Sequence, residues 1–136
     1  MTICVVDTGP LYAAADRDDD DHEASINVLS EPGRVLVIPA LVVAEVTYLI
    51  GTRLGAQAEA TFLAALAEYD VETPLPDEWA RIGELVWQYR DFPLGGTDAS
   101  VVSLAERLHT PVVATLDRRH FQAVRPAHCD AFEILP

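Results

Sequence analysis

Short apolar runs alternate along the chain with longer stretches in which apolar side chains recur every three or four residues. Such runs are typical of buried strands, and the longer stretches are typical of amphipathic helices. Two of the runs are weak or broken by proline, which favours edge strands. The predicted strands are Thr2–Val6, Val35–Ile38 and Val112–Leu116, with edge strands at Val71–Leu75 and Phe132–Leu135.

Helices are predicted in the segments between these strands. They are Leu11–Ala15, His22–Ser30, Ala40–Arg53, Ala56–Glu68, Asp77–Arg90, a helix opened by Asp98, and one turn at Arg118–Gln122. Turn residues separate the elements, among them Asp7 to Pro10 directly after the first strand, and Gly55. Strands joined through helices must pair in parallel, with right-handed crossovers. We therefore expect one α/β domain over residues 1–136.

Two tryptophans fall in the helix predicted at Asp77–Arg90. Trp79 shares a stripe with Ile82 and Val86, so we expect it in the core. Trp87 lies off that stripe, where it either packs in the core or serves a partner surface.

Charge and composition exclude several classes of protein. No apolar run approaches the roughly 20 residues that cross a bilayer, and no basic segment precedes a signal sequence, so we expect a cytoplasmic protein without membrane contact. Nine basic against 22 acidic residues give a net charge of −13, which argues against a broad basic face for nucleic acid. All nine basic residues are arginines. Receiver domains and haloacid-dehalogenase-type phosphatases need a lysine beside their carboxylates, and this chain has none.

Four acidic residues carry the strongest chemical signal. Asp7 and Asp117 follow predicted strands, Glu45 lies in an apolar helix, and Asp98 opens a helix. Ligands of parallel sheets bind beyond the carboxyl ends of the strands, so these side chains can share one crevice. Several carboxylates that converge without a lysine or arginine between them require a cation, and Mg²⁺ or Mn²⁺ fits best. The chemistry implied is phosphodiester hydrolysis. The alternatives are that Asp98 is only a helix N-cap and that Glu45 makes a buried hydrogen bond.

Other polar residues lie next to these acids in the sequence. Thr8 and Thr115 provide hydroxyl groups that can fix a carboxylate rotamer or a metal-bound water. Arg118 and Arg119 are candidates for phosphate contacts at the rim, or for ion pairs with the acidic loop. His120 and His22 receive no catalytic role, because neither has metal-ligand spacing with another histidine.

The acidic loop spans Asp16 to Asp21 and precedes the helix predicted at His22–Ser30. We expect it to cap that helix, because carboxylates favour helix N-termini. A second cation site is the alternative.

In four stretches the chain resembles PIN-domain ribonucleases, and more narrowly the VapC toxins of bacterial type II toxin–antitoxin pairs. The stretches are Val5–Leu11, Pro39–Glu45, Gly96–Ala99 and Thr115–Phe121. The resemblance implies a three-layer α/β/α sandwich around a mainly parallel sheet. It also implies metal-dependent endoribonuclease activity, with Asp7, Glu45, Asp98 and Asp117 holding Mg²⁺ or Mn²⁺.

The resemblance further implies partners. It predicts a homodimer, an RNA substrate such as a transfer RNA or a ribosomal RNA loop, and a cognate VapB-type antitoxin whose C-terminal tail blocks the catalytic groove. The helices around Leu49 to Leu66 are a candidate dimer interface. Two other readings remain: a PIN-like interaction module without activity, and a metal-dependent phosphatase or DNA nuclease on the same scaffold.

Overall fold

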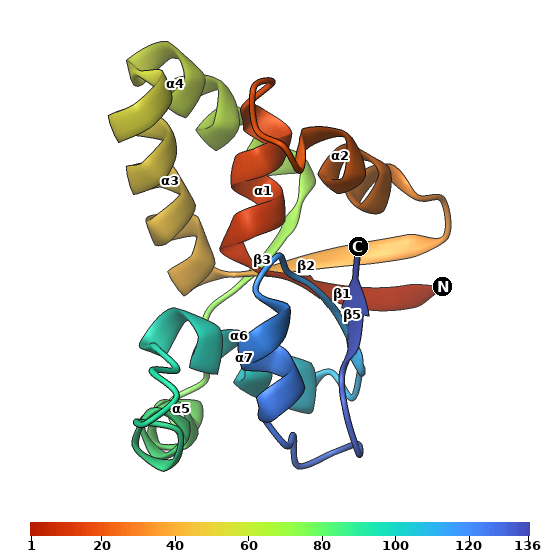
Figure 1. The fold of residues 1–136 in the computed structure, drawn as a ribbon, viewed down its shortest axis with the longest axis vertical. Coiled ribbons are helices and arrows are strands. Elements are labelled where there is room, and N and C mark those ends of the chain that lie inside the picture. Colours follow the sequence, from red (N-terminus) through yellow and green to blue (C-terminus); the bar gives the residue numbers. More distant parts are fainter.

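Five parallel strands form the centre of the protein, in a computed structural model that describes residues 1–136 (Figure 1). They are β1 (Thr2–Val6), β2 (Arg34–Pro39), β3 (Asp70–Glu72), β4 (Val112–Ala114) and β5 (Glu133–Leu135). Their order in the sheet is β3-β2-β1-β4-β5, and every neighbouring pair is parallel. The predicted parallel α/β architecture is confirmed, and the two weak segments are the edge strands β3 and β5.

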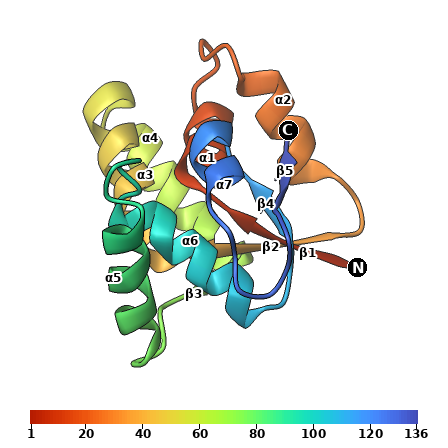
Figure 2. The ribbon, with the colours of Figure 1, turned by 60° about the horizontal axis from the view of Figure 1, so that its bottom comes forward.

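Helices cover both faces of this sheet. They are α1 (Thr8–Ala15), α2 (His22–Ser30), α3 (Ala40–Leu54), α4 (Ala56–Ala65), the 3₁₀ turn η1 (Leu66–Glu68), α5 (Glu78–Gln88), α6 (Gly96–Arg107) and α7 (Arg118–Ala123). Figure 1 shows α1 to α4 on one face and α5 to α7 on the other, which is the predicted three-layer sandwich, and Figure 2 shows α5 and α6 side by side. None of these helices combines the length and the apolar character that a membrane crossing requires.

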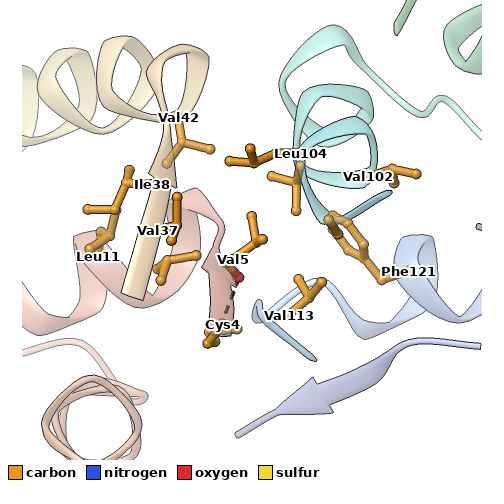
Figure 3. Packing of buried hydrophobic residues seen from close by; sticks show 14 of the residues in the cluster. Cys4, Val5, Leu11, Val37, Ile38, Val42, Val102, Leu104, Val113 and Phe121 are labelled. Atoms are coloured by element: carbon orange, nitrogen blue, oxygen red, sulfur yellow. Dashed lines mark hydrogen bonds between the residues drawn. The ribbon is translucent and has the colours of Figure 1, made fainter. Parts of the chain in front are cut away.

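The core lies on both faces of the three central strands, β2, β1 and β4. Figure 3 shows Val5, Val37 and Val113 side by side on these strands, with apolar side chains from the surrounding helices packed around them. Val5 and Val113 are fully buried, as is Phe121 of α7. A strand segment covered on both faces must be apolar, which explains the uninterrupted apolar run from Ile3 to Val6 in β1.

Helix α1 begins earlier than predicted. The turn expected at Asp7 to Pro10 is wrong, because α1 starts at Thr8 and Asp7 occupies its N-cap position. Proline is compatible with the first helical turn, where no intrahelical donor is needed, so Pro10 does not break the helix. A Cβ atom on Gly9 would lie 3.1 Å from Leu116, so the absence of a side chain lets α1 start close to the segment after β4. Asp7 is thereby held between a strand and a helix.

The expectation that Trp79 lies in the core is wrong. This side chain is 52% exposed, whereas Ile82 and Leu85 of the same helix are buried. Helix α5 packs chiefly against α6, so it buries a narrow stripe, and Trp79 in its first turn lies off the contact. Trp87 is 68% exposed and therefore does not belong to the core either.

The acidic loop does not cap α2 with a side chain as predicted. Asp21 occupies the N-cap position but makes no side-chain capping bond. Instead, Asp16 accepts a hydrogen bond from the backbone N–H of Asp18, and Asp19 accepts one from Asp21. Aspartate readily closes such short turns with its own side chain, so the aspartates stabilise turns within the loop and do not cap α2.

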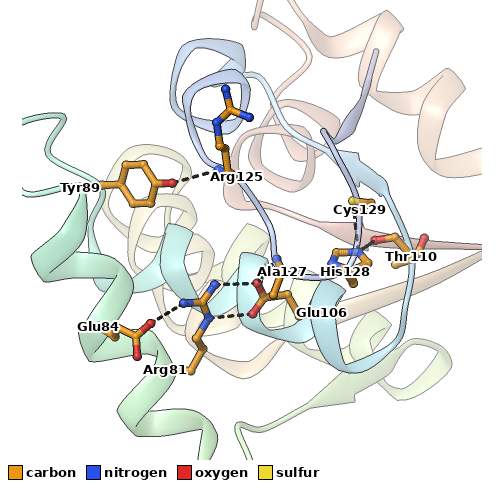
Figure 4. A network of polar contacts seen from close by, with 9 residues as sticks. All are labelled: Arg81, Glu84, Tyr89, Glu106, Thr110, Arg125, Ala127, His128 and Cys129. Carbon is orange, nitrogen blue, oxygen red and sulfur yellow. Dashed lines mark hydrogen bonds and ion pairs between the residues drawn. The ribbon is translucent and has the colours of Figure 1, made fainter.

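A charged network ties α5, α6 and the C-terminal segment together (Figure 4). The guanidinium of Arg81 donates two hydrogen bonds, of 2.9 and 2.8 Å, to the carboxylate of Glu106. The backbone N–H of Ala127 donates a third, of 2.7 Å. Burial raises the pKa of Glu106, but these bonds outweigh burial and hold its pKa below the ordinary value. Glu106 is therefore a structural carboxylate that connects three segments.

Replacing Glu106 by alanine is expected to lower the free energy of unfolding by roughly 1–3 kcal/mol, because it leaves a partly buried guanidinium and a backbone N–H without their acceptor. Glu84 provides the matched control, since it contacts the same Arg81 but its side chain is 66% exposed. Glu84→Ala is expected to change the stability by less than about 0.5 kcal/mol. Urea unfolding followed by circular dichroism measures both. Equal losses in the two variants would contradict a structural role specific to Glu106.

Candidate active site

The candidate site lies where the strand order of the sheet reverses. The chain moves from β1 outward to β2 and β3, then returns to the other side of β1 with β4. In open parallel sheets this reversal opens a crevice at the carboxyl ends of the two central strands. Asp7 directly follows β1 and Asp117 follows β4, so both acids stand at this crevice.

All four predicted acidic residues line one pocket there, with a volume of about 630 Å³. Asp7 comes from the end of β1, Glu45 from α3, Asp98 from α6 and Asp117 from the start of α7. The remaining lining residues are Thr8, Gly9, Pro93, Gly95, Gly96, Thr97 and Leu116. No arginine or lysine lines the pocket, so no guanidinium or ammonium group within it neutralises the carboxylates.

Asp7 is the most buried of the four acids, with 4% of its surface exposed. Its Oδ2 accepts a hydrogen bond of 2.8 Å from the hydroxyl of Thr115, whereas its Oδ1 is buried without any partner. Burial, and next the negative charge of Asp98, raise the pKa of Asp7 to about 7, although the bond from Thr115 acts in the opposite direction. A buried oxygen that lacks a donor is the kind of group that a cation satisfies.

The two predicted threonines occupy different positions around Asp7. The hydroxyl of Thr115 donates to Asp7 and also accepts a bond of 3.0 Å from the backbone N–H of Asp117. It therefore fixes two of the four acids relative to each other. The hydroxyl of Thr8 lies at the pocket, buried and without a partner.

Asp98 lies in the first turn of α6 and is not its N-cap, because Gly95 occupies that position. The alternative that Asp98 serves only as a cap is therefore wrong. Burial raises the pKa of Asp98, and the nearby His120 acts to lower it. The positive end of the helix dipole favours a carboxylate in this turn.

Glu45 is exposed toward the pocket and forms no hydrogen bond with the protein. The alternative of a buried hydrogen bond is wrong. The reason is that α3 buries only one stripe, formed by Val42, Val46 and Ile50, although its sequence is apolar nearly all round. Glu45 lies off this stripe, and its negative charge contributes to the raised pKa of Asp7.

His120 was missed by the sequence reasoning. Its Nδ1 lies 2.7 Å from Oδ2 of Asp117 and 3.2 Å from Oδ2 of Asp98. Asp117 caps α7 by accepting a hydrogen bond of 3.3 Å from the backbone N–H of His120. This bond fixes the position of the Asp117 carboxylate relative to His120. Single ligand atoms of Asp98, Asp117 and His120 all lie within 4.8 Å of one another, so the three could ligate one ion. The i, i+3 spacing of Asp117 and His120 on a helical turn is the sequence signal that could have found this pair.

Arg118 and Arg119 lie outside the pocket lining. Arg118 is exposed and donates to the backbone oxygen of Pro136. The guanidinium of Arg119 stands 5.3 Å from the ring centroid of Phe92. Phe92 in turn contacts the ring of His120, with 5.6 Å between centroids. Neither arginine pairs with the acidic loop, so that alternative is wrong, and Arg119 reaches the pocket rim through Phe92.

Comparison with known proteins shows the family to which the chain belongs. Residues 4–125 match the PIN domain model, so the chain belongs to the PIN-domain family. Among curated proteins it is similar to Ribonuclease VapC26 of Mycobacterium tuberculosis, with 36% identity over 134 residues that cover 97% of this chain and 99% of the relative.

Two solved VapC structures share the fold. The first is Mycobacterium tuberculosis VapC20, described as a sarcin–ricin loop cleaving toxin, with a TM-score of 0.74 and 19% identity over 81% of this chain and 86% of that one. The second is VapBC2 of Rickettsia felis bound to a DNA fragment from its promoter, with a TM-score of 0.71 and 17% identity over 99% of this chain and 100% of that one.

The raised pKa of Asp7 predicts a pH-dependent stability in the absence of metal. Its carboxyl changes from an ordinary value of 3.8 to about 7 on folding, so the folded protein binds this proton more tightly. This contribution to stability is complete below about pH 4 and is lost as the pH rises through about 7. Above pH 7, Asp7→Asn is therefore expected to be more stable than the wild type, on the order of 2 kcal/mol.

Urea unfolding in EDTA at several pH values between 4 and 8 measures this difference, which should shrink toward pH 4. Asp20→Asn is the matched control, because Asp20 is exposed in the acidic loop. A destabilised Asp7→Asn protein at pH 8 would contradict the predicted repulsion and would make Asp7 a structural cap.

Proposed function

We propose that the protein is a VapC-type toxin: a metal-dependent endoribonuclease that hydrolyses RNA phosphodiester bonds in this pocket. One observation carries the proposal, namely that four carboxylates from four separate elements line a single pocket without a lysine or arginine. A protein gains no stability from such mutual repulsion, so the arrangement is best explained by a ligand that the acids bind. The similarity to Ribonuclease VapC26 supports RNA as the substrate.

The residues present fit a hard divalent cation. Asp7 offers a buried carboxylate oxygen without a partner, and Glu45, Asp98 and Asp117 offer further oxygens around the same pocket. Oxygen donors suit Mg²⁺ or Mn²⁺, whereas zinc favours cysteine and histidine. When bound, the ion supplies charge neutralisation, a hold on the scissile phosphate and an activated water. We assign Asp7, Glu45, Asp98 and Asp117 to both metal binding and catalysis.

The chain's own residues orient this site. Thr115 fixes the rotamer of Asp7 and the backbone of Asp117 through its two hydrogen bonds, and Thr8 offers a free hydroxyl beside them. Nδ1 of His120 can hold a proton between Asp98 and Asp117. Arg118 and Arg119, exposed after Asp117, are assigned to contacts with RNA phosphates.

The descriptions of two relatives support the substrate and the partner that we propose. The target we propose is a structured RNA, either a transfer RNA or a ribosomal RNA loop, and the description of VapC20 as cleaving the sarcin–ricin loop supports the second. The VapBC2 complex supports a cognate VapB-type antitoxin, and the net charge of −13 suits a partner with basic side chains. We further propose that the protein acts as a homodimer in the cytoplasm, where its RNA substrates are found.

The two other readings have weaker support. A module that only binds a partner has no physical reason to retain a repulsive acidic cluster, and no observation favours a phosphatase or DNA nuclease over a ribonuclease.

Purified protein is expected to cut total bacterial RNA at discrete positions with Mg²⁺ or Mn²⁺, and to leave it intact in EDTA. Asp98→Asn is expected to lower the cleavage rate by about 100-fold or more, because it removes one charged oxygen of the metal-binding group. Sequencing of the fragment ends identifies the target. Intact RNA under every condition would contradict the proposed function, and equal cleavage by Asp98→Asn would contradict the assigned site.

Metal binding is tested separately from cleavage by thermal unfolding. At about 100 times its Kd, a cation that binds only the folded state adds about 2.7 kcal/mol of stability, which raises the Tm by several degrees. We expect this shift with Mg²⁺ or Mn²⁺ in the wild type and in the exposed-loop control Asp20→Asn, and a much smaller one in Asp98→Asn. Equal shifts in all three proteins would contradict a single metal site formed by the pocket acids.

A further inference from the structure

The arginines of this acidic chain differ in what they contact. Arg81 and Arg107 form ion pairs with glutamates. Arg90 and Arg119, in contrast, have no carboxylate within ion-pair distance and stand over aromatic rings. The guanidinium of Arg90 is 4.1 Å from the ring centroid of Trp87, and that of Arg119 is 5.3 Å from Phe92. No carboxylate neutralises either guanidinium, so both can contact a negatively charged ligand, although the net charge of the protein is strongly negative.

The aromatic ring of each pair lies on the segment that leads into the acidic pocket, and Arg119 reaches Phe92 from α7. Trp87 is in the last turn of α5, and the following loop runs through Arg90 and Phe92 to Pro93, which lines the pocket. Phe92 contacts the ring of His120. The same loop is held against the segment after α7, because the hydroxyl of Tyr89 accepts a bond of 3.0 Å from the backbone N–H of Arg125 (Figure 4). The loop is thus anchored beside the pocket.

Trp87 is not used by the fold. Its side chain is 68% exposed, and the group that stands over its ring is the guanidinium of Arg90. The same guanidinium donates a hydrogen bond of 2.8 Å to the backbone carbonyl of Trp87. This bond holds Arg90 against the ring. A large ring of this kind, fixed next to a positive charge, is a surface on which nucleic-acid bases stack.

We propose that Trp87, Arg90, Phe92 and Arg119 form a platform that binds unpaired nucleotides beside the cleaved phosphodiester. A base stacks on Trp87, and the guanidinium groups of Arg90 and Arg119 contact the neighbouring phosphates. Phe92, held between Arg119 and His120, positions the guanidinium of Arg119 rather than stacking with RNA. This inference rests on the proposed function, since it names the form of RNA that the same pocket takes.

The choice of unpaired over duplex RNA follows from the chemistry of the platform. An aromatic side chain reaches a base face only where the base is unstacked, which duplex RNA does not offer. The net charge of −13 repels a nucleic-acid backbone at long range, so affinity must come from local contacts of this kind. No arginine lines the pocket itself, which leaves the adjoining loop and α7 as the source of positive charge.

Intrinsic fluorescence tests stacking without any need for cleavage. In a Trp79→Phe protein, Trp87 is the only tryptophan left. In EDTA, we expect titration with a mixed-sequence single-stranded RNA 12-mer to quench this fluorescence, and a duplex of the same sequence to have little effect. Absence of quenching by the single strand, or equal quenching by the duplex, would overturn the proposal.

Variants then test the contribution of the platform to binding and cleavage. Trp87→Ala is expected to weaken single-strand binding, measured by fluorescence anisotropy, roughly 5- to 100-fold, and to raise KM for cleavage more than it lowers kcat. Arg90→Gln and Arg119→Gln are expected to weaken binding and to reduce its dependence on salt. Trp79→Ala is the matched control on the same helix, because Trp79 is also exposed but carries no arginine over its ring.

Four outcomes separate this inference from its alternatives. Equal effects of Trp79→Ala and Trp87→Ala would overturn it. So would a change of oligomeric state in Trp87→Ala by sedimentation, which would assign this face to contact between two copies of the chain. Cleavage by the wild type with an unchanged KM in Trp87→Ala overturns the platform and leaves the nuclease standing. Quenching that depends on single strands without any cleavage supports the platform and contradicts the nuclease.

Discussion

The pairing of β1 with β4 is the constraint on which the site depends. Val5 pairs with Val113 and Val6 with Ala114, and the register continues with a hydrogen bond of 2.9 Å from the backbone N–H of Asp7 to the carbonyl of Ala114. Thr115 therefore stands directly beside Asp7 and donates to its carboxylate. A shift of one residue in this register would turn Thr115 to the other face of the sheet and leave Asp7 without its only side-chain donor.

Electrostatic repulsion is the cost of this arrangement. Four carboxylates share one pocket, and burial together with the charge of Asp98 holds the pKa of Asp7 far above its ordinary value. The surrounding core is apolar and closely packed. Outside the pocket, the charged network around Glu106 joins α5 to α6. The destabilised groups are thus concentrated where the proposed chemistry takes place, as is common in enzymes.

Local sequence patterns were sufficient for most of the fold and for the position of the acids. Buried parallel strands have continuous apolar runs, so β1, β2 and β4 could be located, and an acid directly after such a run must stand at the carboxyl edge of the sheet. The errors concern properties that depend on neighbouring elements. The exposure of Trp79 depends on how far α6 extends along α5, and the role of His120 depends on Asp98, which is 22 residues away in the sequence. The early start of α1 depends on the close approach of Gly9 to Leu116.

The hydrogen bond between Thr115 and Asp7 joins residues that are 108 positions apart. Asp7 is synthesised well before its strand neighbour β4 and the acid that follows β4. Contacts of such long range form only after the intervening chain is available. A chain still being translated therefore has its first acid in place but no pocket around it. For a nuclease whose proposed substrates include ribosomal RNA, assembly of the site is delayed until β4 and the start of α7 have been synthesised.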